Sequence, residues 1–372
     1  MRKTTFCLML GMILFLSQIS FAQLTTMPDG GNKHAWVGEQ VGLTDISIVY
    51  NRPGVKGREG KIWGQLVPVG YVDQGFGTSK AAPWRAGANE NTTIEFSTPV
   101  KIEGQDLPAG KYGLFIAWDP NESTVIFSKN STSWGSFFYD DKEDALRVKV
   151  KPTASDHNSE WLHYEFLNET NTGATIALVW EKMMIPFKVE TDYVNLQMAS
   201  IRRELRSEKS FNPGWQSYNQ AAQFTLQSNT NLEEGLGWAD MAINAPFVGQ
   251  KNFVTLSTKA QLLAKLNKQT EADALMKEAL PLGTMQQIHG YGRQLLQRKK
   301  FQEAFDAFKY NYDKNPNQFT TNMGMVRAYS GLANYKKALE FAQKALPQAP
   351  DKPNKDNVEG MIKKLQEGKD VN

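Results

Sequence analysis

The chain has 372 residues, of which 41% are hydrophobic and 11% aromatic, and it carries a formal net charge of +3. This composition is typical of folded domains and excludes a chain that is disordered throughout. A charge so close to zero, without a long basic run, excludes an electrostatic case for nucleic acid or an anionic lipid surface as the partner.

Residues 1–22 have the features of a secretory signal peptide. Arg2 and Lys3 form a basic start, and residues 6–16 form an apolar core. Small residues stand three and one positions before Gln23, so we expect cleavage directly before it. The sequence therefore predicts an exported protein, either periplasmic or extracellular.

The same segment bears on membrane insertion and on cysteine chemistry. Its apolar core is too short to span a bilayer, and no later stretch approaches the roughly 18 apolar residues that a spanning helix needs, so we expect no transmembrane segment in the mature chain. Cys7 is the only cysteine and is lost with the signal. The mature chain is thus expected to have no disulfide, thiolate nucleophile or thiolate metal site.

Residues 24–190 have the pattern of short β-strands. β-Branched and aromatic residues alternate with polar ones, and turn-forming residues at 119–122 and 168–173 separate such runs. The expected strands are 46–50, 93–96, 112–118, 124–127, 146–150, 161–167, 175–180 and 185–189. Because no helical pattern intervenes, we expect an antiparallel all-β sandwich or barrel.

Residues 191–372 have the periodicity of helices and an internal repeat. Prolines recur at spacings of 33, 35, 35 and 34 residues, at Pro213, Pro246, Pro281, Pro316 and Pro350. Small residues recur at spacings of 37, 32 and 34 residues, at Gly235, Ala272, Ala304 and Ala338. A tetratricopeptide repeat has a period of about 34 residues and places small residues where its two helices meet. The sequence predicts a tetratricopeptide-like array, and the alternative is a helical bundle with coincident prolines.

The two ends of this array depart from the repeat pattern. The first unit, around Trp215 and Gly235, fits less well and is expected to be a degenerate capping repeat. Residues 356–367 suggest a polar helix that caps the other end. The expected fold class is therefore α+β multidomain, with a β-sandwich-like domain at 24–190 and an α-helical repeat domain at 191–372.

Five segments of the β domain resemble a known family. They are residues 42–53, 55–58, 84–90, 107–112 and 134–135. In this order they are similar to domain-of-unknown-function family 2911, over a span from about residue 28 to residue 189. That family consists of exported proteins, chiefly of Bacteroidota, with no agreed activity. The resemblance therefore implies export and a β-rich domain but supplies no catalytic residues, and residues 73–83 look like an insertion into the family pattern.

Familiar catalytic motifs and metal sites are missing from the sequence. Residues 52–61 superficially resemble a phosphate-binding loop, but Val55 and Ile62 stand where that motif needs Gly and Ser or Thr. A basic, turn-rich loop is the better interpretation. No serine-hydrolase elbow occurs. The histidines lack the spacing of a metal site, so we expect no metal and no cofactor; they are His34, His157, His163 and His289.

The strongest local candidate for a ligand site lies at residues 84–90. Trp84, Arg85, Asn89 and Glu90 place an indole, a guanidinium, a carboxamide and a carboxylate around a glycine. Such a set suits a sugar or a peptide. The structural alternative is that Arg85 pairs with Glu90 while Trp84 fills the core. Three further tryptophans are expected to be core residues, namely Trp134, Trp161 and Trp180.

Two functional hypotheses follow from these patterns. The favoured one is a binding or scaffolding protein, in which the β domain and the helix pairs engage an envelope protein, peptide or glycan. The other is a hydrolase of glycans or peptides, with Glu90 as general acid or base and Arg85 orienting an anionic group. This enzyme would need a second carboxylate, for which Asp45 and Asp73 are the candidates.

Overall fold

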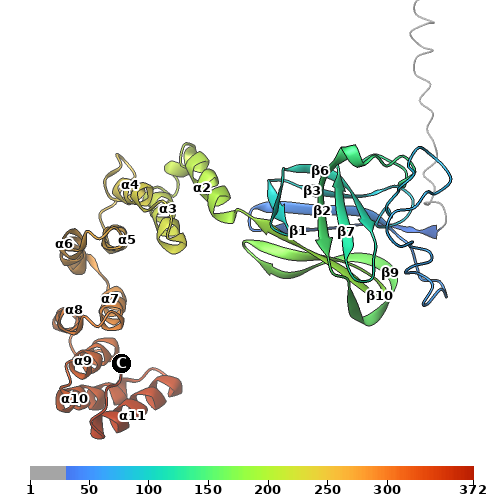
Figure 1. Ribbon diagram of the computed structural model, residues 1–372. Coiled ribbons are helices and arrows are strands. Elements are labelled where there is room, and N and C mark those ends of the chain that lie inside the picture. Colours follow the sequence, from blue (N-terminus) through green and yellow to red (C-terminus); the bar gives the residue numbers. More distant parts are fainter. Residues whose placement is uncertain (1–30) are drawn as a thin grey trace, which may run out of the picture. The chain divides into compact units, whose positions relative to one another are not determined.

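The computed structural model describes residues 31–372, so the predicted signal peptide lies outside the described residues. Contacts divide the described chain between Gln197 and Met198 into two compact units. Residues 31–197 are called the sheet unit, and residues 198–372 the helical unit. Figure 1 colours the sheet unit from blue to green and the helical unit from yellow-green to red.

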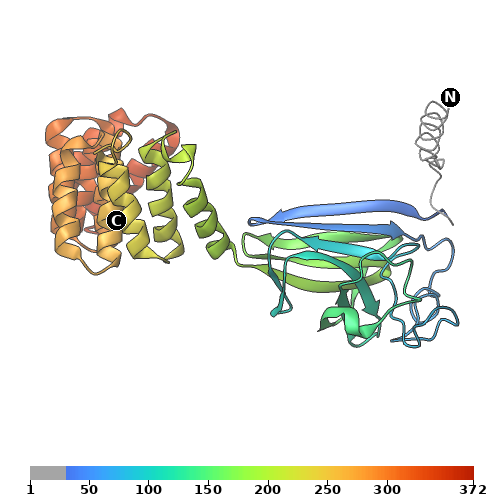
Figure 2. The ribbon, with the colours of Figure 1, turned by 90° about the horizontal axis from the view of Figure 1, so that it is seen from above.

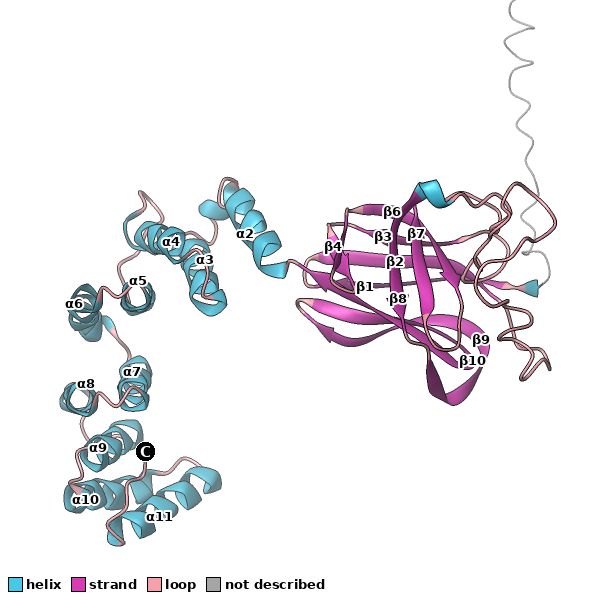
Figure 3. Ribbon diagram, in the orientation of Figure 1, coloured by secondary structure: helices cyan, strands magenta, loops and turns pink. Residues whose placement is uncertain are grey.

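The sheet unit contains two sheets, drawn in magenta in Figure 3. The larger has the strand order β1 (Lys33–Val41), β2 (Thr44–Arg52), β3 (Thr92–Phe96), β6 (Gly110–Ala117), β7 (Ser123–Ser128), β8 (Asp144–Val150). The smaller has the order β5 (Gln105–Leu107), β4 (Val100–Ile102), β10 (Gly173–Thr191), β9 (Thr153–Thr170). All these neighbours pair antiparallel, as the sequence predicts.

Strand β2 shows why these residues form a sheet with one buried face. Ile46, Ile48 and Tyr50 are buried, whereas Asp45 before Ile46 and Ser47 after it are exposed. Successive side chains of a strand point to opposite faces, so this alternation places one face on a core and the other in water.

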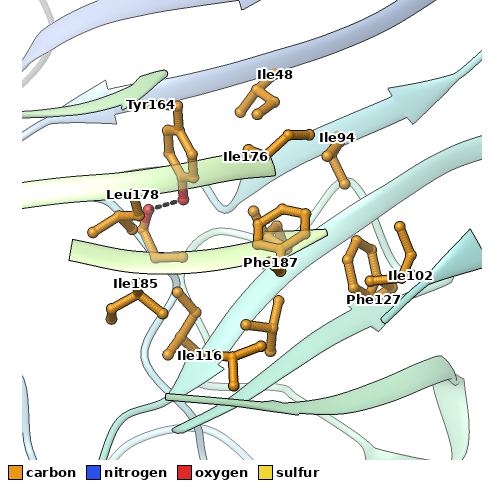
Figure 4. Packing of buried hydrophobic residues seen from close by; sticks show 14 of the residues in the cluster. Ile48, Ile94, Ile102, Ile116, Phe127, Tyr164, Ile176, Leu178, Ile185 and Phe187 are labelled. Carbon is orange, nitrogen blue, oxygen red and sulfur yellow. Dashed lines mark hydrogen bonds between the residues drawn. The ribbon is translucent and has the colours of Figure 1, made fainter. Parts of the chain in front are cut away.

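The two sheets share one hydrophobic core, which makes the domain a sandwich. Figure 4 shows Ile48, Ile94 and Phe127 of the larger sheet gathered with Ile176 and Phe187 of the smaller one. The ring centroids of Phe127 and Phe187 lie 5.8 Å apart in an edge-to-face arrangement. Packing of the two sheets against each other thus buries the apolar faces that the strand patterns predict.

Some strands differ from the sequence expectation. The segments expected at 175–180 and 185–189 form one strand, β10, which continues through a bulge at Glu181, where φ is 53°. Strands β1, β4 and β5 have no counterpart among the expected strands. Most of β1 is exposed, and β4 and β5 have three residues each, so none of them shows a long apolar alternation.

The helical unit consists mainly of successive helix pairs, whose members lie side by side in Figures 1 and 2. The pairs are α3 (Trp215–Ser228) with α4 (Leu232–Asn244), α5 (Phe253–Lys265) with α6 (Gln269–Ala279), α7 (Met285–Gln297) with α8 (Phe301–Lys314), and α9 (Phe319–Gly331) with α10 (Tyr335–Ala345). Helix α2 (Tyr193–Glu204) precedes them and α11 (Lys352–Gln366) follows. Short 3-10 helices are η2 (Asp141–Glu143), η3 (Glu208–Ser210), η4 (Leu280–Leu282) and η5 (Leu346–Gln348).

The repeat pattern of the sequence maps onto these pairs. Pro246 and Pro316 lie in the connections between pairs, and Gly235 of α4 faces α3 so closely that an added Cβ would lie 1.9 Å from Thr225 Oγ1. Its counterparts Ala304 and Ala338 are fully buried. The predicted array of helix pairs is therefore confirmed. Within residues 31–372, no helix has the length and apolar character needed to cross a membrane.

Candidate functional site

The segment at residues 84–90 lies among long loops of the sandwich and is fixed to the larger sheet. The backbone N–H of Trp84 donates to Ile116 O at 2.9 Å, and Ile116 N–H donates back at 2.8 Å. Ile116 belongs to β6, and β3 begins at Thr92 directly after the segment. The segment is therefore held at both of its ends by strands of one sheet.

The turn in this segment depends on two buried hydroxyl groups. The carbonyl oxygen of Ala86 accepts hydrogen bonds from Tyr164 Oη at 2.8 Å and from Thr92 Oγ1 at 3.0 Å. The Tyr164 bond crosses to β9 of the other sheet and is dashed in Figure 4. Ala86 has a φ of 52°, a conformation that non-glycine residues adopt only where their surroundings enforce it. The core thus imposes the backbone path of the candidate site.

Gly87 and Asn89 complete this path. A Cβ at Gly87 would lie 2.7 Å from Thr92 Oγ1 and 3.1 Å from the carbonyl oxygen of Asn51, so only glycine fits without a shift. Asn89 has a φ of 58°, which asparagine tolerates better than most residues. Its side-chain Oδ1 accepts a hydrogen bond from Asn32 Nδ2 at 3.1 Å.

Trp84 belongs to a cluster of four tryptophans under the loops. Its ring is stacked on Trp180, with centroids 6.1 Å apart, and Trp63 packs edge-on to it at 5.7 Å. Trp118 contacts Trp63 at 5.5 Å. Trp180 is buried, as expected, but Trp84 is only partly buried and donates its indole N–H to Gly87 O at 3.2 Å. Trp84 therefore packs against tryptophans of the core, while part of its own surface remains exposed to solvent.

A pocket of about 700 Å³ opens beside these tryptophans. Three of the predicted site residues line it, namely Trp84, Arg85 and Asn89. Its other polar lining comes from Asn32, Lys56, Arg58, Gln65, Gln74 and Ser136. Aromatic lining is added by Phe137 and Trp180. This volume is within the range of small-ligand pockets, and the mixture of aromatic and polar groups is also typical of them.

Arg85 is the central cation of the pocket. Its Nη1 donates to Asn89 O at 2.7 Å, and its guanidinium lies against Gly135, where a Cβ would be 2.6 Å from Cζ. The same group lies over the Phe137 ring, 5.3 Å from its centroid. Burial lowers the pKa of the Arg85 guanidinium below its usual value. Neighbouring groups thus hold this cation in one place at the pocket wall.

Glu90 does not pair with Arg85, so the structural alternative in which these two residues form an ion pair is wrong. Its Oε2 accepts a hydrogen bond from Asn51 Nδ2 at 2.7 Å, and Glu90 is absent from the pocket lining. In the part of the chain that the structure describes, Arg85 and Glu90 form no ion pair. The separation follows from the turn, because Ala86 and Asn89 both have positive φ and direct the two ends of the segment differently.

The carboxylate pair required by the hydrolase hypothesis is not formed by the residues considered for it. Asp73 pairs with Lys80 at 3.1 Å, and Asp45 accepts a hydrogen bond from Gln40 Nε2 at 2.9 Å. Glu90 is bonded to Asn51 instead. The described geometry therefore gives no support to a glycosidase-type mechanism at Glu90.

The remaining tryptophans and the histidines are accounted for individually. Trp134 has 51% of its surface exposed, so the expectation that it is a core residue is wrong. Trp161 is partly buried, with the Lys33 ammonium 4.3 Å from its ring centroid. His163 Nδ1 is 3.2 Å from the carbonyl oxygen of Trp161 within its own strand. Among the described residues, no group of three or more His, Cys, Asp or Glu is arranged to hold a metal ion.

Several pocket residues were not identified from the sequence as site residues. Arg58 lies in the loop that resembled a phosphate-binding motif, and its side chain donates to Val55 O and Gly54 O at 2.9 and 2.7 Å. Gln74 lies in the segment 73–83 that departs from the family pattern, and it donates to Ser136 Oγ at 3.0 Å. In the sequence, the basic loop at 52–61 and the insertion at 73–83 were the only features that pointed to these residues. Long-range packing is what brings the two segments to one pocket.

The sheet unit matches a family model, and the match covers residues 32–189. The family is described as a protein of unknown function, DUF2911, which confirms the resemblance that the sequence motifs indicate. A search of curated proteins gives no match.

Among the solved structures that are similar to this chain, two are described as tetratricopeptide repeat proteins. YrrB, described as a TPR protein with an unusual peptide-binding site, shares 18% identity at a TM-score of 0.30, over 45% of this chain and 89% of its own. A tetratricopeptide repeat protein from Parabacteroides merdae shares 14% identity at a TM-score of 0.33, over 47% and 70%. MamA from Desulfovibrio magneticus shares 18% identity at a TM-score of 0.28, over 41% and 93%. The chain therefore contains, at residues 32–189, a region that matches the DUF2911 family, whose function is unknown, and the helical unit follows this region.

Proposed function

We propose that this chain is an exported binding protein whose sheet unit holds a polar ligand in the pocket beside Trp84. The observation that carries the proposal is the pocket of about 700 Å³, in which Trp84, Arg85 and Asn89 meet Arg58 and Gln74. These residues come from separate stretches of the long connection between β2 and β3, yet they all line one pocket. Convergence of a few polar groups on an aromatic-lined cavity is the usual form of a small-ligand site.

The preorganisation of the site supports binding as its role. The Ala86 carbonyl has two hydrogen-bond donors, Tyr164 and Thr92, and the Arg85 guanidinium is held by Asn89 and Gly135. Rigid positioning reduces the entropy that a site loses when a ligand binds. Strained backbone at Ala86 is likewise a feature that clusters at ligand sites.

The helical unit supplies a scaffold for a second partner in this proposal. Arg293 of α7 and Arg327 of α9 occupy the same position in successive first helices of the pairs, and both line one small pocket. Stacked helix pairs repeat such positions at regular intervals, which suits an extended peptide or protein segment. Scaffolding by this unit and ligand binding by the sheet unit are separate activities and are testable separately.

A pocket-blocking substitution tests the ligand site. Ala88 lines the pocket, so Ala88→Phe is expected to fill part of it and abolish capture of the glycans or peptides that the mature protein retains from envelope extracts. Ala81→Phe, at an exposed position outside this pocket, is the matched control and is expected to retain capture. Mass spectrometry of the retained molecules makes the comparison. Equal retention by both variants would exclude the pocket as the ligand site.

Export is part of the proposal and has its own test. The signal features of residues 1–22 predict an N-terminus at Gln23 in the protein recovered from the periplasm or the medium. Intact-mass analysis distinguishes this product from a chain that retains Met1. Recovery of the protein only in the cytoplasm, with Met1 retained, would contradict export.

A further inference from the structure

The pocket beside Trp84 contains a partly buried positive charge, on Arg85 and Arg58, for which the described residues supply no counter-ion. No Asp or Glu is among the lining residues, and neither Arg85 nor Arg58 forms an ion pair within residues 31–372. The recorded hydrogen bonds of both guanidinium groups go to neutral carbonyl oxygens. Charged groups that lose part of their contact with water are stabilised by an opposite charge, because desolvation without a partner is costly. We therefore expect a ligand to supply the counter-ion for these arginines.

The geometry of Arg85 leaves its remaining donors for such a ligand. A guanidinium has five N–H donors in one plane, and one of them is used by Asn89 O. Gly135 and the Phe137 ring hold the plane in place. Arginine in this setting binds carboxylate, sulfate or phosphate oxygens through two parallel hydrogen bonds.

Neutral groups of the pocket indicate which kind of molecule bears the anionic group. The side-chain amides of Gln74 and Asn89 each keep one buried polar atom without a partner in the described residues, and so does the Trp180 indole N–H. Amides both donate and accept, which matches hydroxyl groups because these also do both. Trp84 is partly exposed and lines the pocket, so it adds an aromatic surface for the C–H side of a sugar ring.

We propose that the pocket beside Trp84 binds an anionic saccharide, with Arg85 and Arg58 receiving the acidic group and Gln74 and Asn89 receiving hydroxyl groups. This inference rests on the proposed function, since it specifies the ligand of the same pocket. An acidic peptide would satisfy the two arginines equally well. The amide groups and the partly exposed Trp84 favour the saccharide, because a peptide has few hydroxyl groups to pair with the amides.

The test compares sugars that differ at one carbon. Glucose, glucuronic acid and glucose 6-sulfate share a ring, and galactose with galacturonic acid and galactose 6-sulfate forms a second set. Ligand-observed NMR on the full mature chain measures binding of each compound, with a tetra-aspartate peptide included. The proposal expects at least one acidic sugar to bind more tightly than its neutral parent by about tenfold or more, as a charge-assisted hydrogen bond predicts. Carboxylate and sulfate members then identify which acid is preferred.

Charge-removing variants assign the effect to the pocket. Arg85→Gln and Arg58→Gln are expected to remove most of the preference for the acidic sugar while leaving weak binding of the neutral parent. Arg85→Lys keeps the charge and is expected to retain part of the preference. Lys182→Gln removes a charge from an exposed position of β10 outside the pocket, and it is expected to change nothing. Raising the salt concentration is expected to weaken binding of the acidic sugar more than binding of its neutral parent, since charge interactions are screened.

The outcomes separate this inference from the proposed function. Neutral sugars that bind as tightly as acidic ones, or a preference that survives both arginine substitutions, would overturn the inference. Binding of the peptide without any sugar would do the same. In each case the proposed function stands if Ala88→Phe still abolishes capture from envelope extracts. Normal capture by Ala88→Phe, whatever the sugar preference, would instead count against the proposed function.

Discussion

At the scale of single residues, the pocket is decided by where each side chain turns within a short segment. Arg85 and Glu90 are five positions apart in sequence, yet one lines the pocket and the other is hydrogen-bonded to Asn51. The positive φ of Ala86 and Asn89 causes this difference. The residue types in the segment predicted a polar site, but the backbone conformation determined which of their side chains line the pocket.

Arg85→Gln is expected to change the stability of the sheet unit by no more than about 1 kcal/mol. The substitution removes one hydrogen bond to Asn89 O but also removes a partly buried charge that no carboxylate among the described residues pairs with. The midpoint of thermal unfolding measures the effect.

A real ion pair in the same unit provides the contrast. Arg147 pairs with Asp144, whose side chain is 7% exposed and whose pKa is raised, mainly by burial. Arg147→Gln leaves that carboxylate without its cation and is expected to cost about 2 kcal/mol or more. A larger loss of stability from Arg85→Gln than from Arg147→Gln would show that Arg85 has a structural role.

At the scale of elements, helix pairs depend on small residues at close approaches. Gly235 and Gly237 lie on the same helix, α4, but only Gly235 faces α3. An added Cβ at Gly235 would collide with Thr225, whereas at Gly237 it would meet nothing within 4 Å. The two positions therefore form a matched pair for testing the packing.

Gly235→Ala is expected to destabilise the helical unit by roughly 1 to 3 kcal/mol through overpacking. Gly237→Ala is expected to stabilise it by about 0.5 to 1 kcal/mol, because alanine has the higher helix propensity. Helical circular dichroism during thermal unfolding measures both. Combining Gly235→Ala with Thr225→Ala should recover part of the loss, and equal effects of the two glycine substitutions would contradict the observed packing.

His289 gives the helical unit a pH dependence. Burial, followed by the nearby Arg327 and Arg293, lowers its pKa from 6.5 to about 4. Its folded pKa lies below the unfolded value, so the unfolded state binds the proton more readily at intermediate pH. The stability contributed by neutral His289 is present above about pH 6.5 and is lost as the pH falls toward 4, by up to roughly 3 kcal/mol.

Comparison with a variant isolates this effect from other titrating groups. His289→Gln cannot be protonated, so its unfolding free energy is expected to fall less between pH 7 and pH 4.5 than that of the original protein. Urea unfolding followed by helical circular dichroism at both pH values measures the difference. Parallel pH profiles for the two proteins would show that His289 is not protonated on unfolding.

At the scale of the whole molecule, strand patterns end and helix patterns begin close to residue 191, and contacts divide the described chain between Gln197 and Met198. Each unit has hydrophobic clusters of its own. A unit with its own core has the main requirement for folding alone.

Fragments of residues 23–192 and 193–372 are expected to fold separately. The first should give a β-type and the second a helical circular dichroism spectrum, each with its own cooperative thermal transition. Their spectra should sum to that of the joined chain. A fragment without a cooperative transition would show that its core needs the other unit.

Local patterns in the sequence determined the class and order of the elements, because strand and helix periodicities are properties of neighbouring residues. The proline and small-residue spacings likewise determined the repeat, and the motifs between residues 28 and 189 indicated the family. Strands without an apolar alternation, such as β1, escaped this reasoning because their partners rather than their own residues specify them.

Only the tertiary structure decided the pocket. Arg58, Gln74 and Arg85 are brought together by the long connection between β2 and β3, whose path depends on contacts with distant strands, such as the bond from Tyr164 to Ala86. The same contacts send Glu90 away from the site that its sequence position suggested. The direction of a side chain in an irregular loop depends on long-range packing, and no local periodicity records it.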